Sequence, residues 1–238
     1  MTEKDMYQQL AEAIGAGDST IMPKIFKLLA NEKEAGFLLA ASPPATIAEI
    51  VEKTGLQPNE VEQMVDPLFK KGLIFKTVKE GITRYYRVRH LLQFHDAAIL
   101  AQGMPPEYFD LWRQYNKTEF KQHHKAIESI LDKSAVRVVP VNITIDPGAR
   151  VAPFDDVKEV VKNARNLAVT KCTCRLIEGD CGKPVEVCIQ LDKAADYAVE
   201  RGTGRQLGKD EALEMLKMCE EEGLVHTVMN TKGLGHVI

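Results

Sequence analysis

The segment Lys171-Cys172-Thr173-Cys174-Arg175, followed by Cys181 and Cys188, organises the second half of the chain. Its spacing is C-x-C-x6-C-x6-C, and it contains four of the five cysteines. Thiolates crowded in this way repel one another unless positive charge lies among them. A metal ion, an iron–sulfur cluster or a pair of disulfides would each resolve that repulsion. The function of the chain depends on which of the three applies.

Length and composition are those of an ordinary globular protein. The chain has 238 residues, enough for one large domain or two smaller ones, and its net charge of −3 gives no overall basic field for nucleic acid. Residues 1–6 lack a signal pattern, and no apolar run approaches the ~18 residues of a membrane span. We therefore expect a cytoplasmic protein without a membrane partner, where clustered cysteines bind metal more often than they form disulfides.

The first half of the chain predicts two short helices followed by a hairpin. Thr46 and Glu49 have the spacing of a capping box, and Gly55 is a helix stop, so a helix is expected between them. Residues 58–71 carry apolar side chains at helical spacing, with Pro67 as a late kink. Residues 73–78 and 82–88 are strand-like and flank a turn, which indicates a β-hairpin.

This order of elements, over about residues 20–90, resembles the winged helix-turn-helix domain of bacterial and archaeal regulators. The resemblance implies a positioning helix at 46–55, a recognition helix at 58–71 and a wing at 73–89. The outer face of the recognition helix would be acidic, which disfavours phosphate contact. The hairpin region is basic, and DNA contact would run through Lys76, Lys79, Arg84 and Arg87. DNA binding and a fold used only for packing both remain open.

Residues 90–131 again predict helices, the longer one opening at Pro105 and Pro106. A long helix after a wing is compatible with a homodimer or with docking of a second domain. His123 and His124 are adjacent, so on a helix they point about 100° apart and do not chelate together easily. We interpret them as part of a polar face.

A turn signal near residues 134–150 predicts the domain boundary. The division is 1–134, a winged-helix domain with following helices, and 135–238, a small cysteine-rich α/β domain. In the second domain we expect a strand at 136–141, a helix after Asp155 or Asp156, and a short strand from Leu167 into Cys172. The expected fold class is mainly α with small β elements (α+β).

Residues 168–175 and 181–188 are similar to the iron–sulfur module of winged-helix–ferredoxin proteins from anaerobic bacteria and archaea. The similarity covers about residues 136–230 and rests on C-x-C-R followed by Cys181, Pro184 and Cys188. It implies that a [4Fe–4S] cluster is held by Cys172, Cys174, Cys181 and Cys188. Four thiolates are also a full ligand set for Zn²⁺, and C-x-C with two longer loops suits zinc as well. Zinc therefore remains the alternative cofactor.

Three other features of the second half receive structural interpretations. Cys219 follows the apolar spacing of a helix and is expected to be a core residue. Residues 202–205 lack the full Rossmann glycine spacing and follow a helix instead of a strand, so a helix–loop–helix turn is expected there. His226 is expected in a strand, partly buried.

These observations predict an iron–sulfur protein that passes single electrons to or from a partner oxidoreductase. No nucleophile–base pair stands out in the sequence, so independent catalysis is not expected. One alternative is a redox- or metal-responsive winged-helix regulator, motivated by the domain order and the basic hairpin. Another is a zinc-stabilised interaction module without a redox role.

Overall fold

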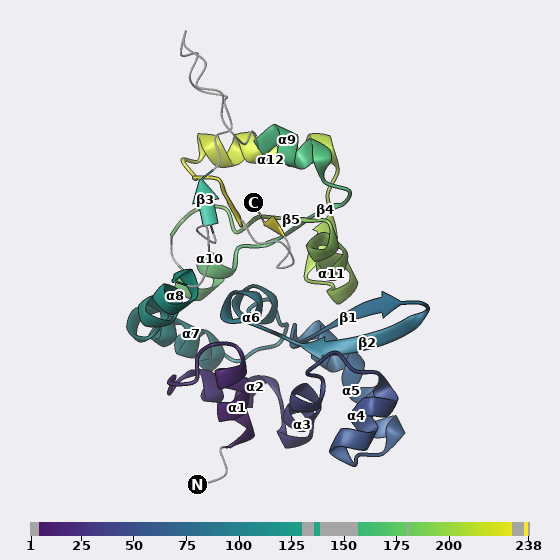
Figure 1. Ribbon diagram of the computed structural model, residues 1–238. Helices are drawn as coiled ribbons and strands as arrows, with labels where there is room; N and C mark the ends of the chain where they lie inside the picture. The colour runs from purple at the N-terminus through teal and green to yellow at the C-terminus, as the bar shows by residue number, and fades with distance from the viewer. Residues whose placement is uncertain (1–4, 130–135, 139–156, 180, 230–235, 238) are drawn as a thin grey trace. The chain divides into compact units, whose positions relative to one another are not determined.

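The structure, a computed structural model, describes residues 5–129, 136–138, 157–179, 181–229 and 236–237 (Figure 1). Helices predominate and the strands form small antiparallel sheets, which confirms the expected mixture of helices with minor β elements. The chain divides into two compact units, Met1–Ile127 and Glu128–Ile238. The sequence placed this division at 134–135. No helix in the described part has the length and apolarity of a bilayer span.

The first unit is helical with one hairpin and has an aromatic core. The rings of Phe26 and Phe94 stack with centroids 4.4 Å apart, and Trp112 lies 5.5 Å from Phe94. All three are fully buried, so three helices share one core. The elements are α1 (Met6–Ala13), α2 (Met22–Leu29), α3 (Glu32–Ala40), α4 (Ile47–Thr54), α5 (Pro58–Lys70), β1 (Ile74–Lys79), β2 (Ile82–Arg87), α6 (Leu91–Ala98), α7 (Pro106–Thr118) and α8 (Phe120–Glu128).

Helix α4 begins and ends as its local sequence predicts. The Thr46 hydroxyl accepts a hydrogen bond from the Glu49 backbone N–H, and the Glu49 carboxylate accepts one from the Thr46 N–H. Gly55 ends the helix in the left-handed conformation, at φ 68°. Helix α5 then starts at Pro58 and continues past Pro67. The capping box is therefore confirmed, and the two helices have the expected bounds.

The hairpin is joined to the segment just before α4. β1 and β2 pair from Ile74↔Arg87 to Lys79↔Ile82, with Glu80 and Gly81 in the turn. Ala45, just before α4, exchanges two backbone hydrogen bonds with Tyr85, of 2.8 and 2.7 Å. The hairpin thus gains a short third strand segment, which holds it against the start of α4.

His123 is not on a polar face, and this prediction was wrong. Its side chain is buried, with Nε2 2.6 Å from Asp18 Oδ1 and Nδ1 2.8 Å from the Tyr115 hydroxyl. Beside it, the Glu119 carboxylate accepts hydrogen bonds from the Ser19 hydroxyl and from the Thr20 N–H and hydroxyl. These contacts bind the start of α8 to the α1–α2 loop. Sequence spacing did not reveal them because the partners lie about a hundred residues away.

In its described part, the second unit contains a four-stranded antiparallel sheet, in the order β6-β4-β5-β8, and a two-stranded sheet of β3 and β7. Helices pack on both faces of the larger sheet. Leu167 and Val169 pack into a core with α9 and α12, whereas Ala168 packs against α11. Every residue of β4 before Lys171 is therefore buried. The elements are β3 (Val136–Val138), α9 (Val157–Asn163), β4 (Leu167–Lys171), α10 (Thr173–Glu178), β5 (Glu186–Leu191), α11 (Lys193–Arg201), β6 (Gly204–Gln206), α12 (Lys209–Glu221), β7 (Thr227–Met229) and β8 (His236–Val237).

The glycine-rich loop after α11 leads to a strand, not to a helix as predicted. Gly202 ends α11 at φ 71°, and Gly204 begins β6, which pairs with β4. A Cβ atom on Gly204 would lie 2.7 Å from the Val169 carbonyl oxygen and 2.8 Å from Thr170 Cγ2. The absence of a side chain at this position lets β6 approach β4, which explains the second glycine without a nucleotide.

Candidate functional site

Cys172 lies where β4 ends and α10 begins. Its N–H donates to the Val185 carbonyl at 2.7 Å, and its own carbonyl accepts from the Leu176 N–H at 3.0 Å. The β4–β5 register shifts between Thr170 and Lys171, immediately before this position. Backbone bonds to a neighbouring chain segment and to a helix therefore both fix the Cys172 position, and its side chain is buried.

Cys174 and Cys188 occupy the two elements that meet at Cys172. Cys174 is exposed in the first turn of α10. Cys188 is partly buried on β5, directly opposite Thr170 of β4. The buried Thr170 hydroxyl donates to the Cys188 carbonyl at 3.4 Å and accepts from Gln190 Nε2 at 3.3 Å. The strand pairing thus brings together cysteines that are sixteen positions apart in the sequence numbering.

The Cys172 thiol interacts with the thiols of Cys174 and Cys188. Hydrogen bonds from the Cys174 and Cys188 side chains hold the pKa of the Cys172 thiol well below its usual range, against the opposing effect of burial. The backbone and positive charge of Arg175 lower this pKa further. None of the five cysteines, all in the described part of the chain, forms a disulfide. The arrangement favours a thiolate, the form that binds metal.

Cys181 is placed differently. It is exposed in the loop between α10 and β5, and it is not among the groups that shift the pKa of Cys172. Gly179, which ends α10, and Gly182 both adopt positive φ, at 86° and 64°. The structure therefore brings together Cys172, Cys174 and Cys188 but leaves the fourth predicted ligand on a glycine-flanked loop.

Within the described residues, no set of three or more His, Cys, Asp or Glu side chains already converges as a metal site. The thiol contacts of Cys172 are therefore not yet a coordination shell. The donor set nevertheless fits the predicted group, because four thiolates are the ligands that a [4Fe–4S] cluster or Zn²⁺ takes.

The three cations near the cysteines have different partners. Arg175 acts on the Cys172 thiol, and its charge also favours the thiolate of Cys219. Lys183 Nζ instead donates to the backbone carbonyl of Glu222 at 2.7 Å. Lys171 is exposed and pairs in register with Glu186. Of these three cations, Arg175 is the one that lowers the pKa of the Cys172 thiol.

Cys219 and His226 lie nearby but differ from the ligand set. Cys219 is buried in α12, as expected, and burial raises the pKa of its thiol. An inert core cysteine has this character. His226 precedes β7 instead of lying within a strand, and burial lowers the pKa of its imidazole. Neither residue is needed to complete the thiolate set.

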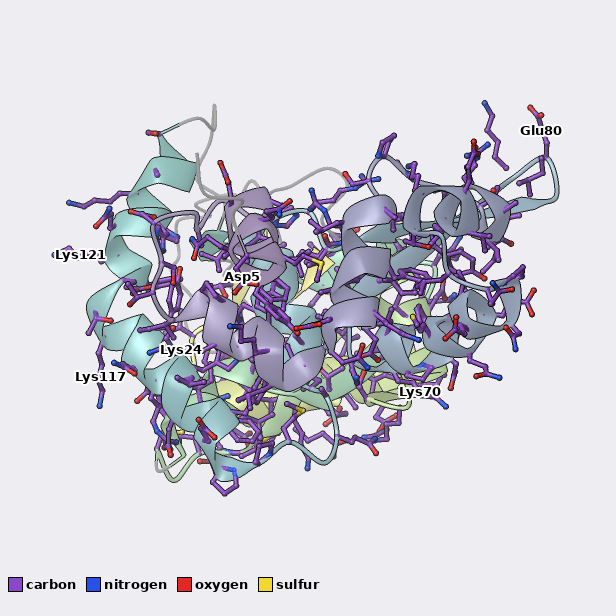
Figure 2. All side chains as sticks on the ribbon, turned by 90° about the horizontal axis from the view of Figure 1, so that it is seen from below. Asp5, Lys24, Lys70, Glu80, Lys117 and Lys121 are labelled. Carbon is purple, nitrogen blue, oxygen red and sulfur yellow. The ribbon has the colours of Figure 1, made fainter. Side chains whose placement is uncertain are left out.

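The basic residues predicted for DNA contact are mostly engaged within the first unit. Arg84 donates to the Glu49 carboxylate at 2.7 Å, and Arg87 donates to the Val88 carbonyl at 2.9 Å. The Lys76 ammonium lies over the Phe69 ring, 5.2 Å from its centroid. Lys79 is exposed near the hairpin tip, beside Glu80, which projects from the turn in Figure 2. This surface is less available to phosphate than the sequence suggested.

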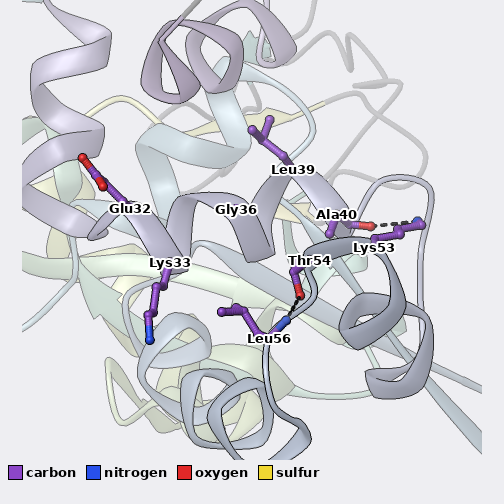
Figure 3. A pocket seen from close by; sticks show the side chains of 8 residues that line it. All are labelled: Glu32, Lys33, Gly36, Leu39, Ala40, Lys53, Thr54 and Leu56. Atoms are coloured by element: carbon purple, nitrogen blue, oxygen red, sulfur yellow. Dashed lines mark hydrogen bonds between the residues drawn. The ribbon is translucent and has the colours of Figure 1, made fainter.

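A pocket of about 400 Å³ lies between α3 and the end of α4 (Figure 3). Its floor is apolar, with Gly36, Leu39 and Leu56, and two lysines lie at its edges. Lys53 Nζ donates to the Ala40 carbonyl at 2.9 Å, and Lys33 Nζ donates to Glu60 at 2.6 Å. Since both ammonium groups are bonded to the protein, this pocket shows no built site for a polar ligand.

Two supporting residues were not recognised from the sequence in these roles. Thr170 anchors the backbone of Cys188, and Lys183 ties the Cys181 loop to the end of α12. A buried threonine opposite a cysteine has no sequence signal without the strand register. For Lys183 the sequence held a weak signal. A loop that carries a ligand has to be held in place, and Lys183 lies only two residues after Cys181.

Comparison with known proteins adds no relative: no protein-family model, no curated protein and no solved structure matches this chain.

Proposed function

We propose that this chain is an iron–sulfur cluster-binding protein that carries single electrons to or from a partner oxidoreductase. The observation that supports it is the set of contacts among Cys172, Cys174 and Cys188, with Cys181 on the adjoining loop. Without a metal centre, three thiols held together in a sequence-clustered set would be liable to oxidation. Binding to a metal would protect these thiols from that oxidation.

The residues of the chain would hold and shield the centre. Cys172 and Cys188 would hold it beside the β4–β5 ladder, and Cys174 would contribute from the first turn of α10. Arg175 offsets the negative charge of the thiolates. A bound cluster supplies reversible uptake of one electron. Because Cys174 and Cys181 are exposed, a partner can approach this edge closely.

Zn²⁺ remains the competing cofactor, and the metal content of the protein distinguishes the two. We expect anaerobically purified protein to contain iron and acid-labile sulfide and to give an EPR signal after reduction. Cys172→Ala should lose the iron, and Cys219→Ala should keep it, because Cys219 is a core residue outside the ligand set. One equivalent of zinc with no iron would overturn the cluster and leave a zinc-stabilised interaction module.

We further propose that the first unit is a winged-helix domain. The order α3, α4, α5 and hairpin, with the Ala45–Tyr85 bridge as a third strand, supports this. A redox-responsive regulator is therefore the second candidate function. Its test is the affinity for promoter DNA as a function of salt, with and without the cluster. Binding that is absent, or that ignores the state of the cluster, would exclude a regulatory switch.

A further inference from the structure

The four cysteines are not held equally by the fold. The backbones of Cys172 and Cys188 belong to the β4–β5 ladder or adjoin it, and the backbone of Cys174 belongs to α10. Regular elements position side chains more precisely than loops do. These three thiols, here called the thiol base, also contact one another through Cys172. Secondary structure thus holds the backbones of all three, although their side chains do not yet converge as a metal site.

Cys181 stands outside the thiol base. Its side chain is exposed, and its loop begins at Gly179 and passes through Gly182, both at positive φ. Glycine at such positions lets the backbone change direction without a steric penalty. The loop rejoins the fold at Val185, whose carbonyl accepts the Cys172 N–H. A loop therefore positions Cys181, whereas regular elements position the other three thiols.

Lys183 ties the Cys181 loop to the end of α12 at one point. Its ammonium group donates to the Glu222 carbonyl at 2.7 Å and lies 3.6 Å from the Glu222 carboxylate. Glu222 is the C-cap of α12, where a cation is favoured by the unpaired carbonyls. The contact is solvent-exposed, so it is weak enough to break and reform. It joins the Cys181 loop to a helix of the second-unit core.

We propose that Cys181 is a releasable fourth ligand beside a base of three thiols on regular elements, and that Lys183 is the positioning residue of its loop. This inference rests on the proposed function, since it assumes that the four cysteines hold one metal centre. With a metal bound, release of Cys181 would break one metal–sulfur bond with the electron pair staying on the Cys181 thiolate, and a thiolate in solution would form the replacing bond. The exchange involves no net oxidation or reduction.

The first test compares cysteine variants after anaerobic reconstitution with iron and sulfide. Cys181→Ala should still take up iron and release it to a chelator roughly 10–100 times faster than the unsubstituted chain. Cys172→Ala and Cys188→Ala should take up none. If Cys181→Ala binds as little iron as Cys172→Ala, the inference is wrong while the proposed function stands. If the unsubstituted chain takes up no iron, both fail.

The second test follows the order in which the thiols become reactive. During slow iron release, alkylation read by mass spectrometry should label Cys181 before any thiol of the base, with buried Cys219 as the internal control. Labelling that begins at Cys172, Cys174 or Cys188 would contradict a releasable fourth ligand.

The third test isolates Lys183. Lys183→Gln should speed iron release a few-fold and cause Cys181 to be labelled earlier. Lys183→Arg, which keeps a donor and the positive charge, should behave like the unsubstituted chain in both measurements. Lys171→Gln is the matched control. Lys171 is also an exposed lysine next to the cysteines, but the contact that ties the Cys181 loop to α12 is made by Lys183. Equal effects of the two glutamine substitutions would show that only the loss of positive charge matters.

Discussion

At the scale of single residues, Cys172 is the central residue of the candidate site. It follows the last residue of β4, precedes the first residue of α10 and accepts hydrogen bonds from two other thiols. A substitution there removes the thiol that contacts both Cys174 and Cys188. This is why the metal content of Cys172→Ala is the sharpest single test of the site.

His90 carries a prediction about pH. It caps α6, with Nδ1 accepting from the Gln93 N–H, and burial lowers the pKa of its imidazole to about 4. Between the ordinary pKa of 6.5 and about 4, the unfolded chain binds a proton that the folded chain does not. The free energy of unfolding of the first unit should therefore fall as pH falls through this window.

The matched variant is His90→Asn, because asparagine can cap the helix but does not titrate. Urea unfolding followed by fluorescence at pH 7 and pH 5 measures the difference. The variant should lose less stability than the unsubstituted chain on going to pH 5. An equal loss in both would mean that His90 does not contribute to the pH dependence.

At the scale of elements, the contact between β6 and β4 depends on Gly204. A Cβ atom there would lie 2.7 Å from the Val169 carbonyl, which is backbone and cannot turn aside. We expect Gly204→Ala to destabilise the second unit by about 1–3 kcal/mol, as overpacking does. Gly208→Ser is the control, since a Cβ atom at Gly208 meets nothing within 4 Å. Thermal unfolding of both variants would reveal the difference, and similar midpoints would refute the close contact.

Helix α8 is held to the α1–α2 loop by charged and polar groups. The Glu119 carboxylate accepts a hydrogen bond from the Ser19 hydroxyl. The Ser19 hydroxyl oxygen in turn accepts one from the Met22 N–H at the start of α2, at 2.8 Å. Glu119→Ala should cost about 1–2 kcal/mol in denaturant unfolding, because it leaves the Ser19 hydroxyl and the Thr20 N–H and hydroxyl without their acceptor. Lys121→Ala, on an exposed side chain of the same helix (Figure 2), should cost little. A loss no larger than that of Lys121→Ala would assign α8 stability to its apolar contacts instead.

At the scale of the whole molecule, the chain divides into two compact units, each with its own buried apolar residues, and we expect metal to act on the second. The one tryptophan, Trp112, is fully buried in the first unit, so its fluorescence reports unfolding of that unit. Protection of Cys219 from alkylation reports the second. Metal removal should lower the midpoint of the Cys219 transition and leave the Trp112 transition in place, because a ligand stabilises only the unit that binds it.

In Cys172→Ala, metal should shift neither transition. If instead both probes move together when metal is removed from the unsubstituted chain, the units unfold as one cooperative body. That outcome would favour the regulatory candidate, which requires the state of the metal centre to reach the hairpin unit.

Local sequence was sufficient wherever the interacting groups lie within a few residues of each other. The capping box of Thr46 and Glu49, the stop at Gly55, the hairpin and the apolar position of Cys219 were all predictable, because cap geometry and side-chain periodicity are local properties. The same holds for the candidacy of the four cysteines, which their spacing alone suggested.

Tertiary structure decided what depends on partners far along the chain. It buried His123 between Asp18 and Tyr115, turned Arg84 toward Glu49, and placed β6 where only glycine fits beside β4. It also separated the cysteines into a thiol base and one exposed loop residue, through the β4–β5 register and the Lys183 contact. Spacing shows which thiols are close in sequence, but strand pairing determines which of them meet in space, since that depends on bonds formed between distant segments.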